Sequence, residues 1–338
     1  MVQNRNILAW ILVILMMIAS LFGCARTQEP EAPQGEQKIN ISIGALKGPT
    51  ALGMLQMMNL AEKGETPDCY SFQIAGTADE LTAALIKGEL QVAALPCNLA
   101  SVLYQKTDGA VQIAAINTGC VLYIVENADT IHTVEDLKGR TIYSTGKGTT
   151  PEYTLNYLLR AAGLEPKKDV TIEYKSEAAE VAALLAEKAD AIAMLPQPYV
   201  TTAAMQNDRL RVALSVAEEW GEYTKDGSAV VTGVVLVSKS FAEEHPQQLQ
   251  ALLAQYEAST RYVNENPAEA ALLSEHFDIV KAKAAEKAIP YCSIMFVQGE
   301  EMKEKVSGYL NVLYNENPAS VGGALPDDGF YYSILPNS

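Results

Sequence analysis

The stretch that decides the fold is Ile39–Leu60, with the sequence INISIGALKGPTALGMLQMMNL. Its first five residues alternate isoleucine with polar side chains, which is the period of a strand with one buried face. Gly48-Pro49 predicts a turn, Thr50 is placed to cap a helix, and the following leucines and methionines recur at helical spacing. A strand, a glycine turn and a capped helix direct free backbone N–H groups at one point, which favours an anionic or hydrogen-bond-accepting ligand.

The same pattern recurs near the middle of the chain. A short strand at Arg140–Tyr143 leads into a polar turn at Ser144–Glu152, and a helix is predicted over Tyr153–Ala162. Each of the two turns carries one lysine, Lys47 in the first and Lys147 in the second. Two such turns predict two lobes that face a shared cleft.

The N-terminal residues predict an exported, lipid-anchored protein. Residues 1–23 begin with a positive charge and contain a nearly unbroken apolar run over Ile7–Ile18, which is the pattern of a signal peptide. The tetrapeptide LFGC, ending at Cys24, resembles a bacterial lipobox, although its phenylalanine departs from the small or β-branched residue usual there. An uncleaved anchor helix or an ordinary signal peptide is the alternative. Residues 24–37 are polar and proline-containing, which predicts a flexible tether.

The composition excludes several functions. A net charge of −16 without any basic stripe argues against a nucleic-acid partner. Apart from Cys24, the cysteines stand singly and far from any histidine, so neither a metal site nor another cofactor is expected. One disulfide and buried free thiols both remain open. The histidines lie away from every predicted strand end and no Ser/His/Asp or Cys/His grouping is present, so we do not expect an enzyme.

Strands and helices alternate along most of the chain after the tether, and the strands are continuous apolar runs. This predicts an α/β fold with parallel-rich sheets covered by helices on both faces. The polar segment Glu218–Ser228 is predicted as a loop. Ser240 is placed to cap a long helix that reaches about Asn264, with Pro246 as a potential break. Further helices are predicted at Pro267–His276, Lys281–Ala288 and Glu300–Tyr314.

Four features together resemble the solute-binding lipoproteins of ABC importers. These are the lipobox, the turn in each half, the sequence VEDLKG at Val134–Gly139 in a short capped helix before a strand, and Val234–Phe241 leading into a long helix. The chain is most similar to the branch for nitrate, sulfonates and taurine, with its thiamine-precursor relatives. That family implies a two-lobed type II periplasmic-binding fold with the ligand cleft between the lobes. On this resemblance we expect residues 38–122 and 234–338 to form lobe 1 and residues 123–233 to form lobe 2.

The resemblance also implies a function. The protein would capture a small solute by cleft closure and deliver it to an ABC permease and its ATPase subunit. The favoured ligand is an oxyanion or sulfonate such as nitrate, taurine or an alkanesulfonate. A neutral heterocycle such as a thiamine precursor, a small-metabolite enzyme and a sensor subunit stay open as alternatives. We expect a monomer, held on the outer face of the bacterial cell membrane by lipid on Cys24.

Ligand-binding residues are expected at the strand ends of both lobes, as backbone N–H groups, hydroxyls, amides and lysines. Several have ordinary explanations, because Thr77 fits a capping box, Asn98 fits a helix cap and turn lysines are usually solvated. The second turn is no phosphate loop, because a glycine follows Lys147. The expected residues are Lys47, Gly48, Pro49, Thr50, Gly76, Thr77, Cys97, Asn98, Asn117, Thr118, Thr145, Gly146, Lys147, Gly148, Thr149, Thr150 and Gln197.

Overall fold

The computed structural model of the chain describes residues 38–224 and 228–333. The predicted signal peptide, the predicted tether and Cys24 lie outside these residues. Within the described ranges, no helix combines the length and the apolar character that crossing a membrane requires.

The first sheet contains six strands from the described residues. They are β1 (Asn40–Leu46), β2 (Cys69–Ala75), β3 (Val92–Pro96), β4 (Val111–Thr118), β10 (Gly233–Ser238) and β11 (Ile294–Val297). Their order across the sheet is β11-β4-β10-β3-β1-β2. β1 pairs in parallel with β2 and β3, whereas β10 runs antiparallel to β3 and β4, and β11 antiparallel to β4.

The second sheet contains five strands of the described chain. They are β5 (Leu122–Glu126), β6 (Thr141–Ser144), β7 (Thr171–Tyr174), β8 (Ile192–Pro196) and β9 (Arg211–Ser215), in the order β7-β6-β8-β5-β9. β6 pairs in parallel with β7 and β8, whereas β5 runs antiparallel to β8 and β9. Both sheets are therefore mixed, and the predicted parallel pairing is confined to β2, β1 and β3 in one and to β7, β6 and β8 in the other.

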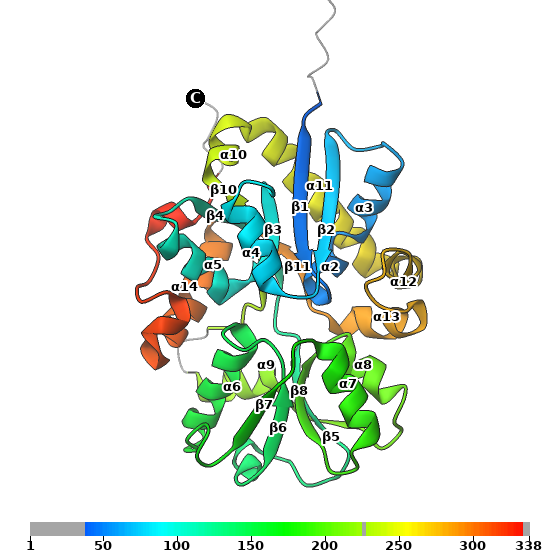
Figure 1. The fold of residues 1–338 in the computed structure, drawn as a ribbon, viewed down its shortest axis with the longest axis vertical. Coiled ribbons are helices and arrows are strands. Elements are labelled where there is room, and N and C mark those ends of the chain that lie inside the picture. Colours follow the sequence, from blue (N-terminus) through cyan, green and yellow to red (C-terminus); the bar gives the residue numbers. More distant parts are fainter. Residues whose placement is uncertain (1–37, 225–227, 334–338) are drawn as a thin grey trace, which may run out of the picture. The chain divides into compact units, whose positions relative to one another are not determined.

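Helices connect the strands and cover the sheets (Figure 1). The parallel strands need such crossover connections, because a two-residue turn can join only antiparallel strands. The α-helices are α2 (Pro49–Leu52), α3 (Leu55–Glu62), α4 (Ala78–Ile86), α5 (Cys97–Lys106), α6 (Thr150–Ala161), α7 (Ala178–Glu187), α8 (Tyr199–Ala204), α9 (Val216–Tyr223), α10 (Lys239–Glu244), α11 (Pro246–Glu265), α12 (Pro267–His276), α13 (Ala282–Ala288) and α14 (Gly299–Glu316). The 3₁₀ turns are η1 (Val134–Leu137), η2 (Ile289–Tyr291), η3 (Pro318–Val321) and η4 (Asp328–Phe330).

One apolar core spans elements of both sheets. It includes Leu95 of β3, Leu155 of α6 and Tyr309 of α14, all fully buried. The ring of Trp220 on α9 lies between Tyr157 and Tyr309, with centroid distances of 4.6 and 5.4 Å. Burial of apolar surface stabilises by about 25 cal/mol per Å², so this shared core holds α6 against α14. The start of α6, where the second predicted turn lies, is thereby fixed in position.

Three local predictions were wrong. Residues 218–223 of the segment predicted as a loop belong to α9, because the buried Trp220 anchors one face of the helix while Glu218 and Glu222 stay exposed. The cap expected at Ser240 lies at Ser238, which accepts a hydrogen bond from Phe241 N at 3.3 Å, whereas the break expected at Pro246 is confirmed, because α10 ends at Glu244 and α11 begins at Pro246. The strand β11 was missed, because its four residues lie between helices and pair only with the distant β4.

Candidate ligand-binding cleft

A cavity of about 310 Å³, called the cleft below, lies among the strand ends of both sheets. Its lining includes the last residues of β1, β3 and β8 and the residues that follow β2, β6 and β7. Leu122, at the start of β5, and Thr232, just before β10, complete the lining where the chain passes from one sheet to the other. Open α/β sheets bind ligands at the carboxyl ends of their strands, so this position is typical of a ligand site.

The first turn contributes Lys47, Pro49 and Thr50 to the cleft. Gly48 has φ +130°, a conformation open to glycine, and a Cβ there would lie 3.6 Å from the ring of Tyr199. Thr50 does not cap α2 as predicted, because Gly48 is the N-cap and the Thr50 hydroxyl donates to Leu46 O at 2.9 Å. The charge of Lys47 is already paired, since its Nζ lies 3.1 Å from Asp278 Oδ2.

The second turn contributes Thr145, Gly146, Lys147, Thr149 and Thr150. Gly146 and Gly148 have φ +69° and +79°, and the Thr149 hydroxyl donates to Gly146 O at 2.7 Å. These contacts give the turn a defined shape. The exposed Lys147 has no ion-pair partner among the described residues, so its charge is available to a ligand.

Four helices begin at the wall of the cleft. The first residues of α2, α4, α6 and α7, namely Pro49, Ala78, Thr150 and Ala178, all line it. The first backbone N–H groups of a helix have no intrahelical partner and carry a partial positive charge, which favours an anion, although Pro49 in α2 and Pro151 in α6 have no N–H to offer. The side chains Lys147 and Lys175 add positive charge, while Asp79 and Glu177 line the same cavity and oppose it.

Gly76 and Thr77 lie where the two walls of the cleft approach each other. A Cβ on Gly76 would lie 2.9 Å from Oε1 of Glu177, so this approach requires glycine unless Glu177 moves. The capping box predicted for Thr77 is wrong, because the Thr77 side chain accepts no hydrogen bond from the backbone of α4 and its hydroxyl instead donates to the Glu80 carboxylate at 2.8 Å.

The other predicted residues lie around the cleft without lining it. These are Gly48, Cys97, Asn98, Asn117, Thr118, Gly148 and Gln197. The fully buried Asn98 side chain donates to Gly148 O at 3.3 Å and to Ser320 O at 3.0 Å, and accepts from the Thr150 hydroxyl at 3.3 Å. It therefore fixes the second turn against the first sheet, rather than capping α5, whose N-cap is Pro96.

Asn117, Thr118, Gln197 and Cys97 are likewise held by the protein. Asn117 Nδ2 donates to Tyr256 Oη at 2.8 Å and to a backbone carbonyl, and the Thr118 hydroxyl donates to Asn117 Oδ1 at 3.2 Å. Gln197 Oε1 accepts from the Thr201 hydroxyl at 2.9 Å. Burial raises the pKa of the Cys97 thiol, so it stays neutral. Direct ligand contact by these residues stays a prediction.

Six polar residues of the cleft were missed in the sequence: Asp79, Lys175, Ser176, Glu177, Tyr199 and Thr232. Lys175 and Glu177 follow β7, and the rule that strand ends carry ligand groups could have found them. Tyr199 follows β8 after a cis Gln197-Pro198 bond. Burial, and then the nearby Glu177 carboxylate, raise the pKa of Tyr199 to about 12, so its phenol is a neutral donor at pH 7.

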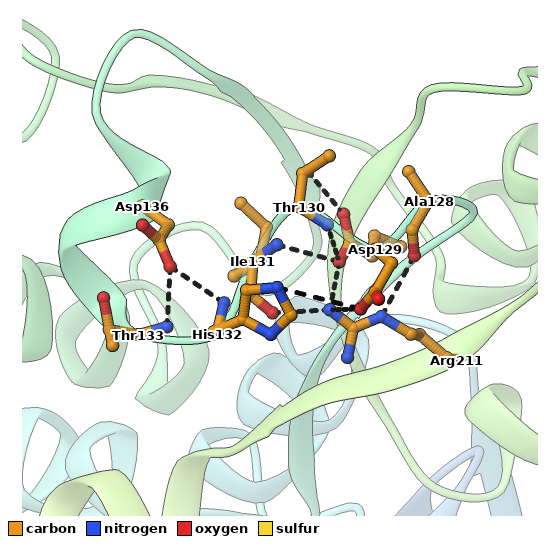
Figure 2. A network of polar contacts seen from close by, with 9 residues as sticks. Ala128, Asp129, Thr130, Ile131, His132, Thr133, Asp136 and Arg211 are labelled. Atoms are coloured by element: carbon orange, nitrogen blue, oxygen red, sulfur yellow. Dashed lines mark hydrogen bonds and ion pairs between the residues drawn. The ribbon is translucent and has the colours of Figure 1, made fainter.

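A second polar cluster, the Glu126 cluster, comprises Glu126, Asp129, Thr130, Ile131 and Arg211, all but the first of which are labelled in Figure 2. None of these residues lines the cleft. The Glu126 side chain is 1% exposed and accepts from Thr130 N at 2.9 Å, Thr130 Oγ1 at 2.8 Å, Ile131 N at 2.9 Å and Arg211 Nη2 at 2.5 Å. Burial alone would raise the pKa of Glu126, but these hydrogen bonds outweigh it and hold the pKa below its usual 4.5. Arg211 also pairs with Asp129 at 3.0 Å.

The loop that the Glu126 cluster holds continues into η1. Asp136 Oδ2 accepts from His132 N and Thr133 N, each at 2.9 Å, as Figure 2 shows. Thr133 and Asp136 form a capping box, which confirms the short capped helix predicted there. Within the described part of the chain, no group of three or more His, Cys, Asp or Glu side chains is placed to hold a metal ion.

Comparison with known proteins places this geometry in a family. A family profile described as ABC transporter, phosphonate, periplasmic substrate-binding protein matches residues 57–288. No curated protein that was compared matches the chain.

Solved structures share the fold. An ABC transporter protein from Parabacteroides distasonis matches with a TM-score of 0.72 and 23% identity, over 87% of this chain and 99% of its own. The periplasmic aliphatic sulphonate-binding protein SsuA from Escherichia coli matches with a TM-score of 0.71 and 16% identity, over 89% and 94%. The periplasmic nitrate-binding protein NrtA from Synechocystis PCC 6803 matches with a TM-score of 0.56 and 15% identity, over 77% and 69%. The predicted fold class is confirmed, and the chain belongs to the family of periplasmic substrate-binding proteins of ABC transporters.

Proposed function

We propose that this protein captures a small organic oxyanion, a sulfonate or phosphonate on a short organic body, in the cleft and hands it to an ABC permease and its ATPase subunit. The observation that carries the proposal is the convergence of the starts of α2, α4, α6 and α7 on one cavity, beside the unpaired Lys147. Sulfonate and phosphonate share a tetrahedral head with three oxygens, which several N–H donors can bind at once.

The size and the apolar lining of the cleft support an organic ligand over a bare inorganic ion. Its volume of about 310 Å³ lies at the lower end of the range for small-molecule sites, so a nitrate ion would leave most of it unfilled. Leu46, Leu122, Pro96 and Pro196 line the cavity and offer apolar contacts to a short carbon chain. The Synechocystis neighbour is named as a nitrate-binding protein. For this cleft, however, nitrate is less favoured than a sulfonate or phosphonate.

A neutral heterocycle, such as a thiamine precursor, is the second candidate. One observation favours it, because the ring of Tyr199 lines the cleft and aromatic rings stack on heterocycles. The lysines and helix starts would then contact neutral acceptors, a weaker use of their charge. The anion therefore stays the favoured ligand.

For the mechanism we propose two lobes, residues 38–122 with 234–338 and residues 123–233, which close over the ligand by hinge bending. The contacts between α6 and α14 would hold the two lobes together on one side of the cleft, which favours a hinge there. There Thr154 Oγ1 lies 2.8 Å from Tyr309 Oη, and Arg160 is paired with Glu316. On the other side Gly76 and Glu177 meet without any hydrogen bond, so this side would open to admit the ligand.

We also propose that Cys24 carries lipid and anchors a monomer on the outer face of the cell membrane. The support is the apolar run followed by LFGC in the sequence. Replacement of Cys24 by alanine should release the protein into the soluble fraction or leave an unprocessed precursor. Normal processing and membrane retention of that variant would contradict the proposal. Light scattering of the soluble part at several concentrations tests the monomer.

A ligand panel tests the function. Methanesulfonate, ethanesulfonate, taurine, methylphosphonate, nitrate and a hydroxymethylpyrimidine are added to the purified protein, and the melting temperature is measured. A hundredfold excess over Kd stabilises by about 2.7 kcal/mol, so a cognate sulfonate or phosphonate should raise the melting temperature by several degrees. The compound should be recovered unchanged, and X-ray scattering should show a smaller radius of gyration when it is bound.

Each of the other possible results of that panel would contradict a different part of the proposal. Stabilisation by the pyrimidine alone would replace the anion with the heterocycle. Stabilisation by nitrate alone would contradict the organic body. Chemical conversion of the bound compound would favour an enzyme, and an unchanged scattering profile would contradict hinge closure while leaving binding intact.

A further inference from the structure

A second cavity, called the groove below, lies beside α8 and α13. Its lining comes from β5, β9, α8 and the residues next to α8 on one side, and from α13 and η2 on the other. The groove and the cleft share a wall, because Leu122 and Pro196 line the cleft while the adjacent Tyr123 and Gln197 line the groove. The volume of the groove is about 590 Å³, within the range of about 300–1,000 Å³ that is usual for small-molecule sites.

Exposed apolar side chains gather in the groove. Among the described residues six large apolar side chains are exposed, and three of them, Met205, Val212 and Tyr291, line this one cavity. Tyr123 adds a second aromatic ring to the lining. Single exposed apolar side chains are ordinary, but a group of them in one hollow marks a binding surface.

Positive charge lies on the α13 side of the groove. Lys283 and Lys287 are one helical turn apart, both are exposed, and neither has an ion-pair partner among the described residues. Lys281, just before the same helix, is by contrast paired with Glu275 at 3.1 Å. Asp208 is the one acidic residue in the described lining, so the groove carries a net positive charge on a chain of net charge −16.

A ligand with an apolar ring and a negatively charged group would match this lining. The rings of Tyr123 and Tyr291 and the side chain of Val212 offer contacts to the apolar body, and the two free ammonium groups attract the charge. We propose that the groove is a second binding site, for an aromatic carboxylate or sulfonate, separate from the solute held in the cleft. This inference goes beyond the proposed function and does not depend on it, because no residue that lines the cleft lines the groove.

Naphthalene-1-sulfonate is the probe that tests the inference, and naphthalene-1-sulfonamide is its neutral counterpart. Calorimetry measures the affinity of the purified protein for both compounds. The double variant Lys283→Ala/Lys287→Ala removes the charge of the groove. The matched control, Lys63→Ala/Lys87→Ala, removes the same charge from two exposed lysines outside both cavities, and Lys147→Ala reports on the cleft.

The parent should bind the sulfonate more tightly than the neutral sulfonamide. Lys283→Ala/Lys287→Ala should bind the sulfonate about tenfold more weakly than the parent, which is the scale of two lost contacts between exposed charges. Its affinity for the sulfonamide should stay the same. Val212→Ser should weaken the binding of both compounds about threefold, the scale of one buried methylene group. The matched control and the cleft variant should bind both compounds as the parent does.

Other results would overturn the inference. Absence of binding to the parent, or equal binding to the parent and Lys283→Ala/Lys287→Ala, would remove the groove as a site. Equal weakening by the two double variants would show that the probe responds only to the net charge of the protein. Loss of binding in Lys147→Ala alone would place the probe in the cleft, which would overturn this inference and support the proposed anion site. A dimer in light scattering that Val212→Ser dissociates would make the groove an interface between two copies of the chain.

Discussion

The Glu126 cluster and the cleft are both polar, but they differ in how far the protein satisfies its own groups. Glu126 accepts four hydrogen bonds from three residues while almost fully buried. In the cleft, Lys147 has no ion-pair partner among the described residues. Saturation marks a cluster that holds the fold, and unused donors mark a surface prepared for a ligand.

The largest effect on stability is expected from Glu126→Gln. The amide keeps one acceptor but brings two donors toward Thr130 N, Ile131 N and Arg211, which are donors themselves. Loss of one partner from a buried charged pair costs about 3 kcal/mol or more, so the free energy of unfolding in urea should fall by about that amount. Glu177→Gln, the same change on an exposed cleft residue, should alter it by less than about 0.5 kcal/mol.

Ligand affinity of Glu126→Gln, measured where the protein is fully folded, should equal that of the parent. A weaker affinity without unfolding would mean that the Glu126 cluster communicates with the cleft, and the comparison between a structural and a binding cluster would fail.

The pH dependence of the unfolding free energy tests whether the charge of the Glu126 carboxylate stabilises the loop. The pKa of Glu126 is lower in the folded protein than its usual 4.5, so its contribution is present above that value and is lost as pH falls through the folded pKa. The difference in unfolding free energy between parent and Glu126→Gln should therefore shrink as pH falls below about 4.5. A difference that stays constant down to pH 2 would show that the carboxylate charge is not what stabilises the loop.

Lys147→Ala should lower anion affinity without changing stability, whereas Glu126→Gln should lower stability without changing anion affinity. Loss of a charged hydrogen bond to an anion costs about 2 kcal/mol, so affinity should fall by that amount while the melting temperature without ligand stays the same. Lys63→Ala, a change to an exposed lysine that does not line the cleft, should leave affinity and stability unchanged. Equal affinities for the parent and Lys147→Ala in calorimetry would remove Lys147 from the binding site.

Much of the fold could be predicted because its signals are local. The alternation at the start of Ile39–Leu60, the Gly48-Pro49 turn and the capped segment before β6 are each encoded within a few residues. These signals predicted the strands and the turns at their ends. The α9 helix was missed because its buried Trp220 packs against Tyr157 and Tyr309, both of which are far away in the sequence.

The state of some residues in and around the cleft could not be predicted, because it depends on partners far away in the sequence. Asn98 is bound to Ser320, and Lys47 is paired with Asp278, more than two hundred residues apart in each case. Sequence patterns therefore located the turns, while long-range packing decided which of their side chains remain free.

The smallest effect is expected from Lys47→Ala, and it tests the comparison within the cleft itself. Lys47 lines the cavity as Lys147 does, but it is engaged by Asp278, whose side chain is 93% exposed. Exposed ion pairs contribute about 0–1 kcal/mol, so neither stability nor anion affinity should change by more than that. Asp278→Asn is the informative partner variant, because it frees the ammonium group and should strengthen anion binding slightly. If Lys47→Ala weakens binding as much as Lys147→Ala does, the ion pair must open when ligand enters, and pairing in the ligand-free protein would no longer separate the two turns.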